Sequence, residues 1–193
     1  TKEIDAQGLA VAPGFINMLS WATESLIIDG KSQADIRQGV TLEVFGEGSS
    51  MGPLNNQMKE DELAAMKRDP DAEYDIDWTT LGEYLESLER RGVSPNVASF
   101  IGATSVRVHE LGYANRLPDD EEMNRMKALV RQAMEEGALG VGASLIYAPA
   151  NYSGTEEVIE LCKVAGEYGG MYITHMRSEG NNIFGAVDET IRI

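Results

Sequence analysis

The chain has 193 residues, of which 42% are hydrophobic, and 32 acidic side chains stand against 16 basic ones, so the formal net charge is −16. Because such an acidic surface repels phosphate backbones and anionic lipids, we expect neither nucleic-acid nor membrane partners. The single cysteine, Cys162, excludes an internal disulfide framework, no apolar run approaches the roughly 20 residues of a membrane helix, and a charged start without an apolar leader favours a cytoplasmic protein.

Short apolar runs alternate with longer amphipathic ones, and this alternation is typical of a parallel sheet with crossover helices. Consecutive β/α units of this kind are joined by right-handed crossovers. We therefore expect an α/β fold of five β/α units, with its short apolar runs at residues 9–16, 41–45, 97–101, 139–145 and 171–174.

Amphipathic stretches between these runs predict helices. At residues 118–136, an early proline and the acids that follow it favour the first helical turn. Ser153 and Glu156 predict a capping box at the start of another helix. The long stretch 46–76 is rich in glycine, methionine and acids and is expected to be functional or mobile, with helix only near 60–68. The remaining predicted helices cover residues 32–38, 78–91 and 182–193.

Two architectures fit this order: an open five-stranded sheet with helices on both faces, or part of a TIM-type (β/α)8 barrel. We favour the barrel, because polar residues follow the strand ends and no glycine-rich phosphate fingerprint supports a nucleotide fold. A complete barrel usually needs about 250 residues, so only its first five or so units are expected. In a barrel, chemistry lies where the strands end, which selects residues 17–21, 46–50, 102–107, 144–152 and 175–179.

His175 follows the fifth predicted strand directly, so its side chain is expected in the barrel mouth. A neutral imidazole there is a good zinc ligand, and the alternative is a histidine held by hydrogen bonds at a strand end. Glu47 follows the second strand among glycines, where a carboxylate can reach a metal or take a proton. Its alternative is a solvated loop acid. Cys162 is expected to be a packed thiol, and His109 to be structural or exposed.

Four other side chains follow predicted strand ends. Arg177 and Glu179 come just after His175 and either orient a metal ligand, clamp a substrate carboxylate or pair with each other. Tyr147 and Tyr152 flank a proline after the fourth strand and either offer a phenol donor to a substrate or pack within the loop. The residues alone leave these alternatives open.

Several local motifs of this chain occur together in one enzyme family. They are IDA at 4–6, VAPGFI at 11–16, QGVT at 38–41, GEGSSMGPL at 46–54, FIGA at 100–103, IYAP at 146–149 and THMRSE at 174–179. With these motifs, which extend over essentially the whole chain, it resembles the N-acyl-D-amino-acid deacylase (D-aminoacylase) family of the amidohydrolase superfamily. That family consists of zinc-dependent hydrolases that cut the amide of an N-acylated D-amino acid, and its fold is a metal-bearing barrel with a small β-sandwich.

The resemblance implies that residues 1–10 are a remnant of the N-terminal β-sandwich and residues 11–193 the first half of the barrel. It implies that His175 is the family's metal-binding histidine on strand five, with Glu47 as a further candidate ligand. It also implies one zinc ion and a small N-acyl amino acid or related amide as substrate. From their positions after predicted strand ends, we expect Ser49, Tyr147, Tyr152, Arg177 and Glu179 to contact this substrate.

The chain departs from the family pattern at several ligand positions. The family's histidine pair after strand one is replaced by Leu19 and Trp21, its preceding aspartate by Asn17, and its strand-two cysteine by Glu47 or nothing. The strand-six ligand and the catalytic aspartate would lie beyond Ile193. The resemblance therefore implies no general base within this chain. Because a catalytic zinc site needs three protein ligands, we also expect no normal turnover from the chain alone.

Two alternatives to the hydrolase remain. The first is a non-catalytic barrel-type binding protein that has lost its metal at Leu19 and Trp21 and favours ligand stacking on the indole. The second is a half-barrel that another copy or another chain completes by self-association through its open edge, because proteins rarely tolerate an apolar, unpaired sheet edge.

Overall fold

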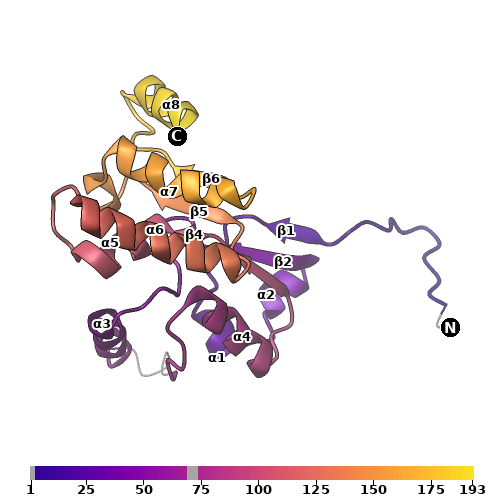
Figure 1. The fold of residues 1–193 in the computed structure, drawn as a ribbon. Helices are drawn as coiled ribbons and strands as arrows, with labels where there is room; N and C mark the ends of the chain where they lie inside the picture. Colours follow the sequence, from indigo (N-terminus) through magenta and orange to yellow (C-terminus); the bar gives the residue numbers. More distant parts are fainter. Residues whose placement is uncertain (1–2, 69–73) are drawn as a thin grey trace.

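Six strands form the framework of the computed structural model, which describes residues 3–68 and 74–193 (Figure 1). Every strand pair is parallel, and the pairing orders are β1-β2-β3 and β4-β5-β6. Each strand therefore lies beside its neighbour in the sequence, as predicted for consecutive β/α units. The strands are β1 (Phe15–Asn17), β2 (Val40–Phe45), β3 (Asn96–Ser99), β4 (Ile101–Gly102), β5 (Gly140–Ser144) and β6 (Met171–His175).

The third predicted strand is two short strands in the structure. β3 pairs with β2 whereas β4 pairs with β5, and only Phe100 separates them. The amide of Phe100 still donates to the carbonyl of Phe45 (2.9 Å), and the amide of Leu139 donates to the carbonyl of Ser99 (2.9 Å). This segment therefore joins the two sheets by changing partner at Phe100, which a run of apolar residues does not reveal.

Helices connect or follow the strands. α4 and α6 begin with complete capping boxes, formed by Thr80 with Glu83 and by Asp119 with Glu122. Gly92 ends α4 at φ +80°, a conformation that favours glycine. The helices of the described chain are α1 (Ser25–Ile28), α2 (Gln33–Ile36), α3 (Asn56–Met66), α4 (Leu81–Arg91), α5 (Ala103–Leu111), α6 (Asp120–Glu135), the 3₁₀ segment η2 (Ala150–Tyr152), α7 (Thr155–Glu167) and α8 (Ile183–Arg192).

The helices predicted at 78–91, 118–136 and 182–193 are confirmed as α4, α6 and α8. One helix was not predicted and one local prediction is wrong. No prediction covered α5, whose apolar and polar residues do not segregate clearly to opposite faces. The capping box of Ser153 does not form, because α7 begins one residue later than predicted, with Gly154 as its N-cap and without a side-chain cap bond.

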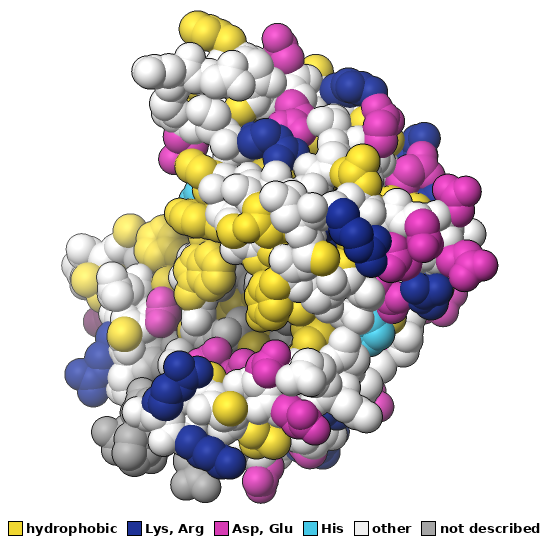
Figure 2. Space-filling view, turned by 90° about the vertical axis from the view of Figure 1, so that its left-hand side faces the viewer, with side chains coloured by type: hydrophobic (Ala, Val, Ile, Leu, Met, Phe, Trp, Pro, Cys, Tyr) yellow, Lys and Arg dark blue, Asp and Glu magenta, His cyan; other side chains and the backbone are white. Residues whose placement is uncertain are grey.

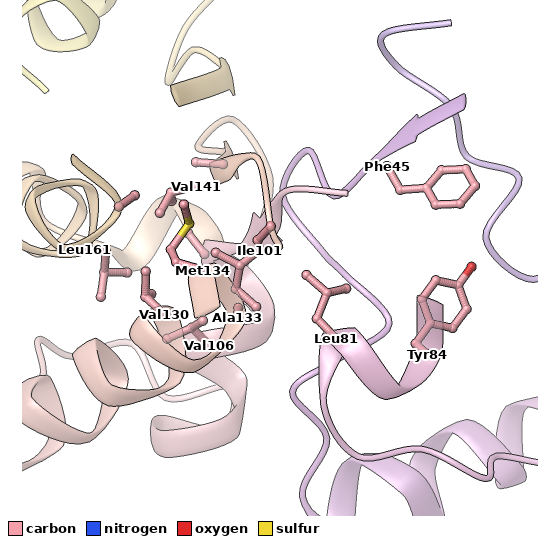
Figure 3. Close-up of a cluster of buried hydrophobic side chains, with 14 of the residues drawn as sticks. Phe45, Leu81, Tyr84, Ile101, Val106, Val130, Ala133, Met134, Val141 and Leu161 are labelled. Carbon is pink, nitrogen blue, oxygen red and sulfur yellow. The ribbon is translucent and has the colours of Figure 1, made fainter. Parts of the chain in front are cut away.

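The hydrophobic core lies where the helices pack against the strands, and Figure 3 shows two groups within it. Phe45 of β2 lies near Tyr84 of α4, while Val141 of β5 lies near Val130 of α6 and Leu161 of α7. Each of these five side chains is at most 1% exposed. Burying such a side chain stabilises a fold by roughly 1.5–3 kcal/mol, so both groups fix the positions of the strand ends.

Large apolar side chains remain exposed at two places. Phe15 and Ile16 of β1 are more than half exposed, and Phe184 and Ile191 lie on the open side of α8, with Phe184 84% exposed. Figure 1 shows α8 at one end of the molecule, beyond β6. Within the described residues, no helix combines the length and the apolar character needed to cross a bilayer.

Candidate active site

His175 lies at the end of β6, and its ring meets the side chain of Glu47. Its position is fixed by the parallel register that pairs Ser144 with His175, and by the amide of Leu145, which donates to the His175 carbonyl (2.9 Å). The Nδ1 atom of His175 lies 2.6 Å from Oε2 of Glu47. The structure therefore brings together the two side chains that the sequence singled out as candidate metal ligands.

The loop that carries Glu47 depends on two glycines. Gly46 and Gly48 have φ values of +92° and +91°, which favour glycine because it lacks a Cβ atom. A Cβ on Gly46 would lie 2.0 Å from the carbonyl oxygen of Phe100, and one on Gly48 would lie 2.4 Å from Oγ of Ser144. Because the loop is pressed this closely against the neighbouring strand ends, the Glu47 carboxylate is directed toward β6.

The contact between Glu47 and His175 allows two chemical roles. A carboxylate that hydrogen-bonds one ring nitrogen orients the imidazole and leaves the other nitrogen for a metal. Alternatively, both side chains bind one ion. Two ligands at about 2.0–2.1 Å from a tetrahedral zinc ion stand about 3.3 Å apart, so the 2.6 Å contact would open by about 0.7 Å. Both roles are within reach of ordinary side-chain movement.

A complete metal site is absent from residues 3–68 and 74–193, where no group of three His, Cys, Asp or Glu side chains is placed to hold an ion. Leu19 and Trp21, after β1, present apolar side chains, and Trp21 is 64% exposed. Asn17, at the end of β1, accepts a hydrogen bond from the amide of Leu19 (3.3 Å). The described chain thus offers two candidate ligands, whereas a catalytic zinc ion takes three from its protein.

The tyrosines and Ser49 occupy different surroundings. The ring centroid of Tyr147 lies 6.0 Å from that of His175, with the planes tilted by 53°, and Tyr147 is exposed. Tyr152 is half-buried in η2. Ser49 is exposed beside Glu47 and lines a neighbouring cavity. Of these three side chains, Tyr147 is placed against the histidine ring.

Arg177 is engaged within the chain. Its Nε donates to Glu189 of α8 (2.9 Å), Nη1 to the carbonyl of Asn151 (3.0 Å) and Nη2 to the carbonyl of Ser153 (2.9 Å). Hydrogen bonds from Arg177 hold the pKa of Glu189 below its ordinary value. Arg177 therefore pairs with Glu189, whereas Glu179 is exposed. The contacts of Arg177 fasten α8 to η2, close to the end of β6.

The two side chains expected to be inert are placed accordingly. Cys162 is half-buried on α7, and burial raises the pKa of its thiol to about 12, which removes the nucleophilic thiolate at neutral pH. His109 lies on α5, where Nδ1 stands 2.9 Å from Oε1 of Glu110. Neither side chain lines the cavity beside Glu47.

Sequence reasoning missed Glu43, a fully buried carboxylate in β2. Oγ of Ser20 donates to it (2.6 Å), as does Oγ of Ser32 (2.9 Å). These bonds tie the segments before and after α1 to the strand. The one signal in the sequence was a charged residue inside the apolar run 41–45.

A cavity of about 690 Å³ opens beside Glu47, between α3 and the strand-end loops. Figure 2 shows a hollow on this face, with hydrophobic side chains along it and acidic ones at its edge. Trp21 and Met51 contribute apolar surface, while Asp61 and Glu62 of α3 contribute carboxylates. The predicted excursion 46–76 is therefore part of a ligand-sized cavity, although its residues 69–73 lie outside the described chain.

No protein-family model matches the chain. The chain is 35% identical over 191 residues to a D-aminoacylase of Alcaligenes xylosoxydans xylosoxydans. The aligned region covers 98% of this chain and 39% of that protein. A D-aminoacylase structure, described for its binuclear metal centre, superposes with a TM-score of 0.79 at 31% identity, covering 93% of this chain and 37% of its own. The N-acyl-D-glutamate deacylase of Bordetella bronchiseptica, solved with zinc and a phosphonate inhibitor, shares the fold (TM-score 0.74, 22% identity, the same coverage). The chain thus spans about two fifths of the length of the curated relatives it matches.

Proposed function

The chain is a relative of the D-aminoacylase family of amidohydrolases, and from this relationship we propose that it forms part of a zinc-dependent hydrolase that cleaves the amide C–N bond of N-acyl amino acids. One observation carries the proposal: the carboxylate of Glu47 and the ring of His175 meet at 2.6 Å where parallel strands end. Amide hydrolysis needs a polarised carbonyl and an activated water, and a metal bound at such a pair provides both.

In this proposal Glu47 and His175 hold one zinc ion together with a third ligand from outside the 193 residues. A zinc ion held there would supply Lewis-acid chemistry, polarising the amide carbonyl and lowering the pKa of a coordinated water. The chain's own residues are proposed to bind and orient the substrate: Tyr147, beside the His175 ring, offers its phenol as a donor, and Ser49 lines the adjoining cavity. A substrate contact for Tyr152, which is half-buried in η2 and does not line that cavity, stays a prediction. The general base is proposed to lie outside this chain, because no third His, Cys, Asp or Glu side chain joins the pair among the described residues.

The contacts of Arg177 favour a scaffold role over substrate binding. Three of its nitrogen atoms already donate to Glu189 and to two carbonyl groups. We propose that Arg177 fixes the segment after β6 and so keeps His175 in place. A substrate role for Arg177 and for the exposed Glu179 stays a prediction.

We also propose that residues 11–193 form the first half of a TIM-type (β/α)8 barrel. Two observations support this proposal. The strands are parallel and follow one another in chain order. Val44 and Phe100 are buried but lie outside the main hydrophobic cluster, as expected for side chains that fill the interior of a barrel. Residues 3–10 carry no helix or strand and are almost all exposed, which suits a remnant of a second unit; residues 1–2 lie outside the description. The apolar surface of β1 and α8 is then covered by the rest of the barrel or by a second copy.

A cytoplasmic location stays a prediction.

Zinc binding to the purified chain tests the proposal. We expect His175→Ala to abolish binding above background and Glu47→Gln to weaken it by about 10–100-fold, because each removes or neutralises a group that holds or orients the ion. His109→Ala is the matched control, since His109 is the other of the chain's two histidines and lies on α5. Competition with a chromophoric chelator gives the affinities. Equal losses in the His109 and His175 variants would contradict the assignment.

A second candidate is the non-catalytic binding protein, and one observation favours it. The indole of Trp21 is 64% exposed at the cavity, in the region where the family carries metal ligands. Zinc analysis of a longer protein that contains this chain separates the two functions. About one zinc ion per chain supports the hydrolase, whereas a metal-free protein that still binds N-acyl amino acids supports the binder.

A further inference from the structure

The cavity beside Glu47 has a composition that points to one class of ligand. One side of it is a single face of α3, because Met58, Asp61, Glu62 and Ala65 recur at three- and four-residue spacing and all line the cavity. The opposite side comes from the strand-end loops, which include Trp21 and Glu47. Glu47 is thus shared between this cavity and the candidate active site, whereas His175 does not line the cavity itself.

Carboxylates dominate the charge of this cavity. Glu24, Glu47, Asp61 and Glu62 line it, and Arg68 is the basic residue among its described lining residues. Glu47 faces His175, which leaves three carboxylates toward the cavity. Partial burial and the nearby carboxylate of Glu62 raise the pKa of Glu24. The fixed charges therefore repel one another, and a cation among them relieves the repulsion.

The same cavity carries apolar surface suited to an aliphatic stem. Met51, Leu54 and Ile76 line it, and the exposed indole of Trp21 stands at its edge. An ammonium or guanidinium group on a flexible stem packs its methylenes on such surface while the charged head meets carboxylates and an aromatic face. A carboxylate head would meet three like charges instead.

We propose that this cavity binds the cationic side chain of an N-acylated basic amino acid, of the lysine or arginine kind, and discriminates against acidic side chains. The inference rests on the proposed function, because an amide bound next to Glu47 on the cavity wall would also lie near His175, which contacts Glu47. It names the substrate class, which the relationship to other deacylases leaves open. The α3 carboxylates act as specificity residues that contact the side chain of the ligand.

Isothermal titration of the metal-free chain with N-acetyl-D-arginine, N-acetyl-D-leucine and N-acetyl-D-glutamate tests this. We expect the arginine derivative to bind tightest and the glutamate derivative to bind at least about tenfold more weakly. Glu62→Gln should weaken the arginine derivative by about fivefold and strengthen the glutamate derivative. Glu60→Gln is the matched control, because Glu60 is an exposed acid of the same helix that does not line the cavity.

Asp61→Asn repeats the measurement if Glu62→Gln disturbs folding, which circular dichroism reports; Glu62 also accepts a hydrogen bond from Tyr74 (2.9 Å). Equal affinities for the three derivatives, no binding of any of them, or equal effects of the Glu60 and Glu62 variants would overturn the inference. The zinc titration of Glu47 and His175 is independent of this result. If the chain binds zinc as proposed but shows no charge preference among the three derivatives, only the cavity assignment is contradicted. If it shows the charge preference but does not bind zinc through Glu47 and His175, only the hydrolase proposal is contradicted.

Discussion

The two sheets each bury a carboxylate, and they satisfy it in different ways. Beside β4-β5-β6, Glu157 of α7 accepts two hydrogen bonds from Nη1 of Arg107 (2.8 and 2.7 Å), and the arginine is fully buried. In β1-β2-β3, Glu43 accepts from Ser20 and Ser32 and forms no ion pair within the described chain. One half uses a buried ion pair and the other uses hydroxyl groups.

The two networks hold different parts of the molecule. Arg107 also donates to the carbonyls of Ala114 and Arg116, so one side chain fastens α5, α7 and the connection after α5. This half carries His175. The hydroxyl bonds of Glu43 hold the segments around α1, close to Trp21 and the cavity. Breaking each network in turn tests whether the Arg107–Glu157 pair mainly determines stability and the Glu43 hydrogen bonds mainly determine the geometry of the site.

Removing the buried guanidinium is expected to have the largest effect. Arg107→Ala leaves Glu157 buried without its partner, and losses of this kind cost about 3–5 kcal/mol. Urea denaturation measures the free energy of unfolding. Arg131→Ala is the control, because the Arg131–Glu167 pair is exposed and should cost less than about 1 kcal/mol. A double change of Arg107 and Glu157 to Met should recover most of the loss, and equal losses in the two arginine variants would remove the scaffold role.

Removing the hydroxyl-bonded carboxylate is expected to have an intermediate effect. Glu43→Ala deprives Ser20 and Ser32 of their acceptor, which costs about 1–3 kcal/mol. Because Ser20 adjoins Trp21, the tryptophan emission should also shift, whereas the Arg107 variant should leave it unchanged at low urea. Glu86→Ala, on the exposed side of α4, is the matched control and should stay within about 0.5 kcal/mol. If the Glu43 variant loses the expected stability but its tryptophan emission does not shift, Glu43 stabilises the fold without shaping the site.

The smallest effect is expected at the contact that fastens α8. Arg177 holds the pKa of Glu189 below its ordinary value, so this contact stabilises the fold at neutral pH and loses its contribution as pH falls through the lowered pKa. Glu189→Gln should cost less than about 1 kcal/mol at pH 7 and flatten the pH dependence of unfolding below about pH 5. Glu179→Gln should leave the profile unchanged, since Glu179 is exposed. Steeper acid unfolding in the Glu189 variant would reverse the assigned sign.

Local patterns alone determined much of the framework. The apolar runs located the strands β2, β5 and β6 to within one or two residues, because parallel strands covered on both faces form short continuous apolar runs. The amphipathic stripes located α4, α6 and α8, because burial on one face of a helix imposes a period of 3.6 residues. The same reasoning placed Glu47 and His175 directly after strands. It failed at α5, whose apolar residues do not form a clear stripe, and at Phe100, where the strand changes partner.

Tertiary structure alone decided which distant groups meet. Glu47 and His175 are 128 residues apart in sequence, and their contact depends on strand order, parallel register and two glycines that admit close backbone approach. The same holds for the pairing of Arg177 with Glu189 rather than Glu179, for the burial of Glu43, and for the acidic cavity beneath α3. Periodicity reports which face of an element is buried, whereas the partner of that face is set by packing between elements far apart along the chain.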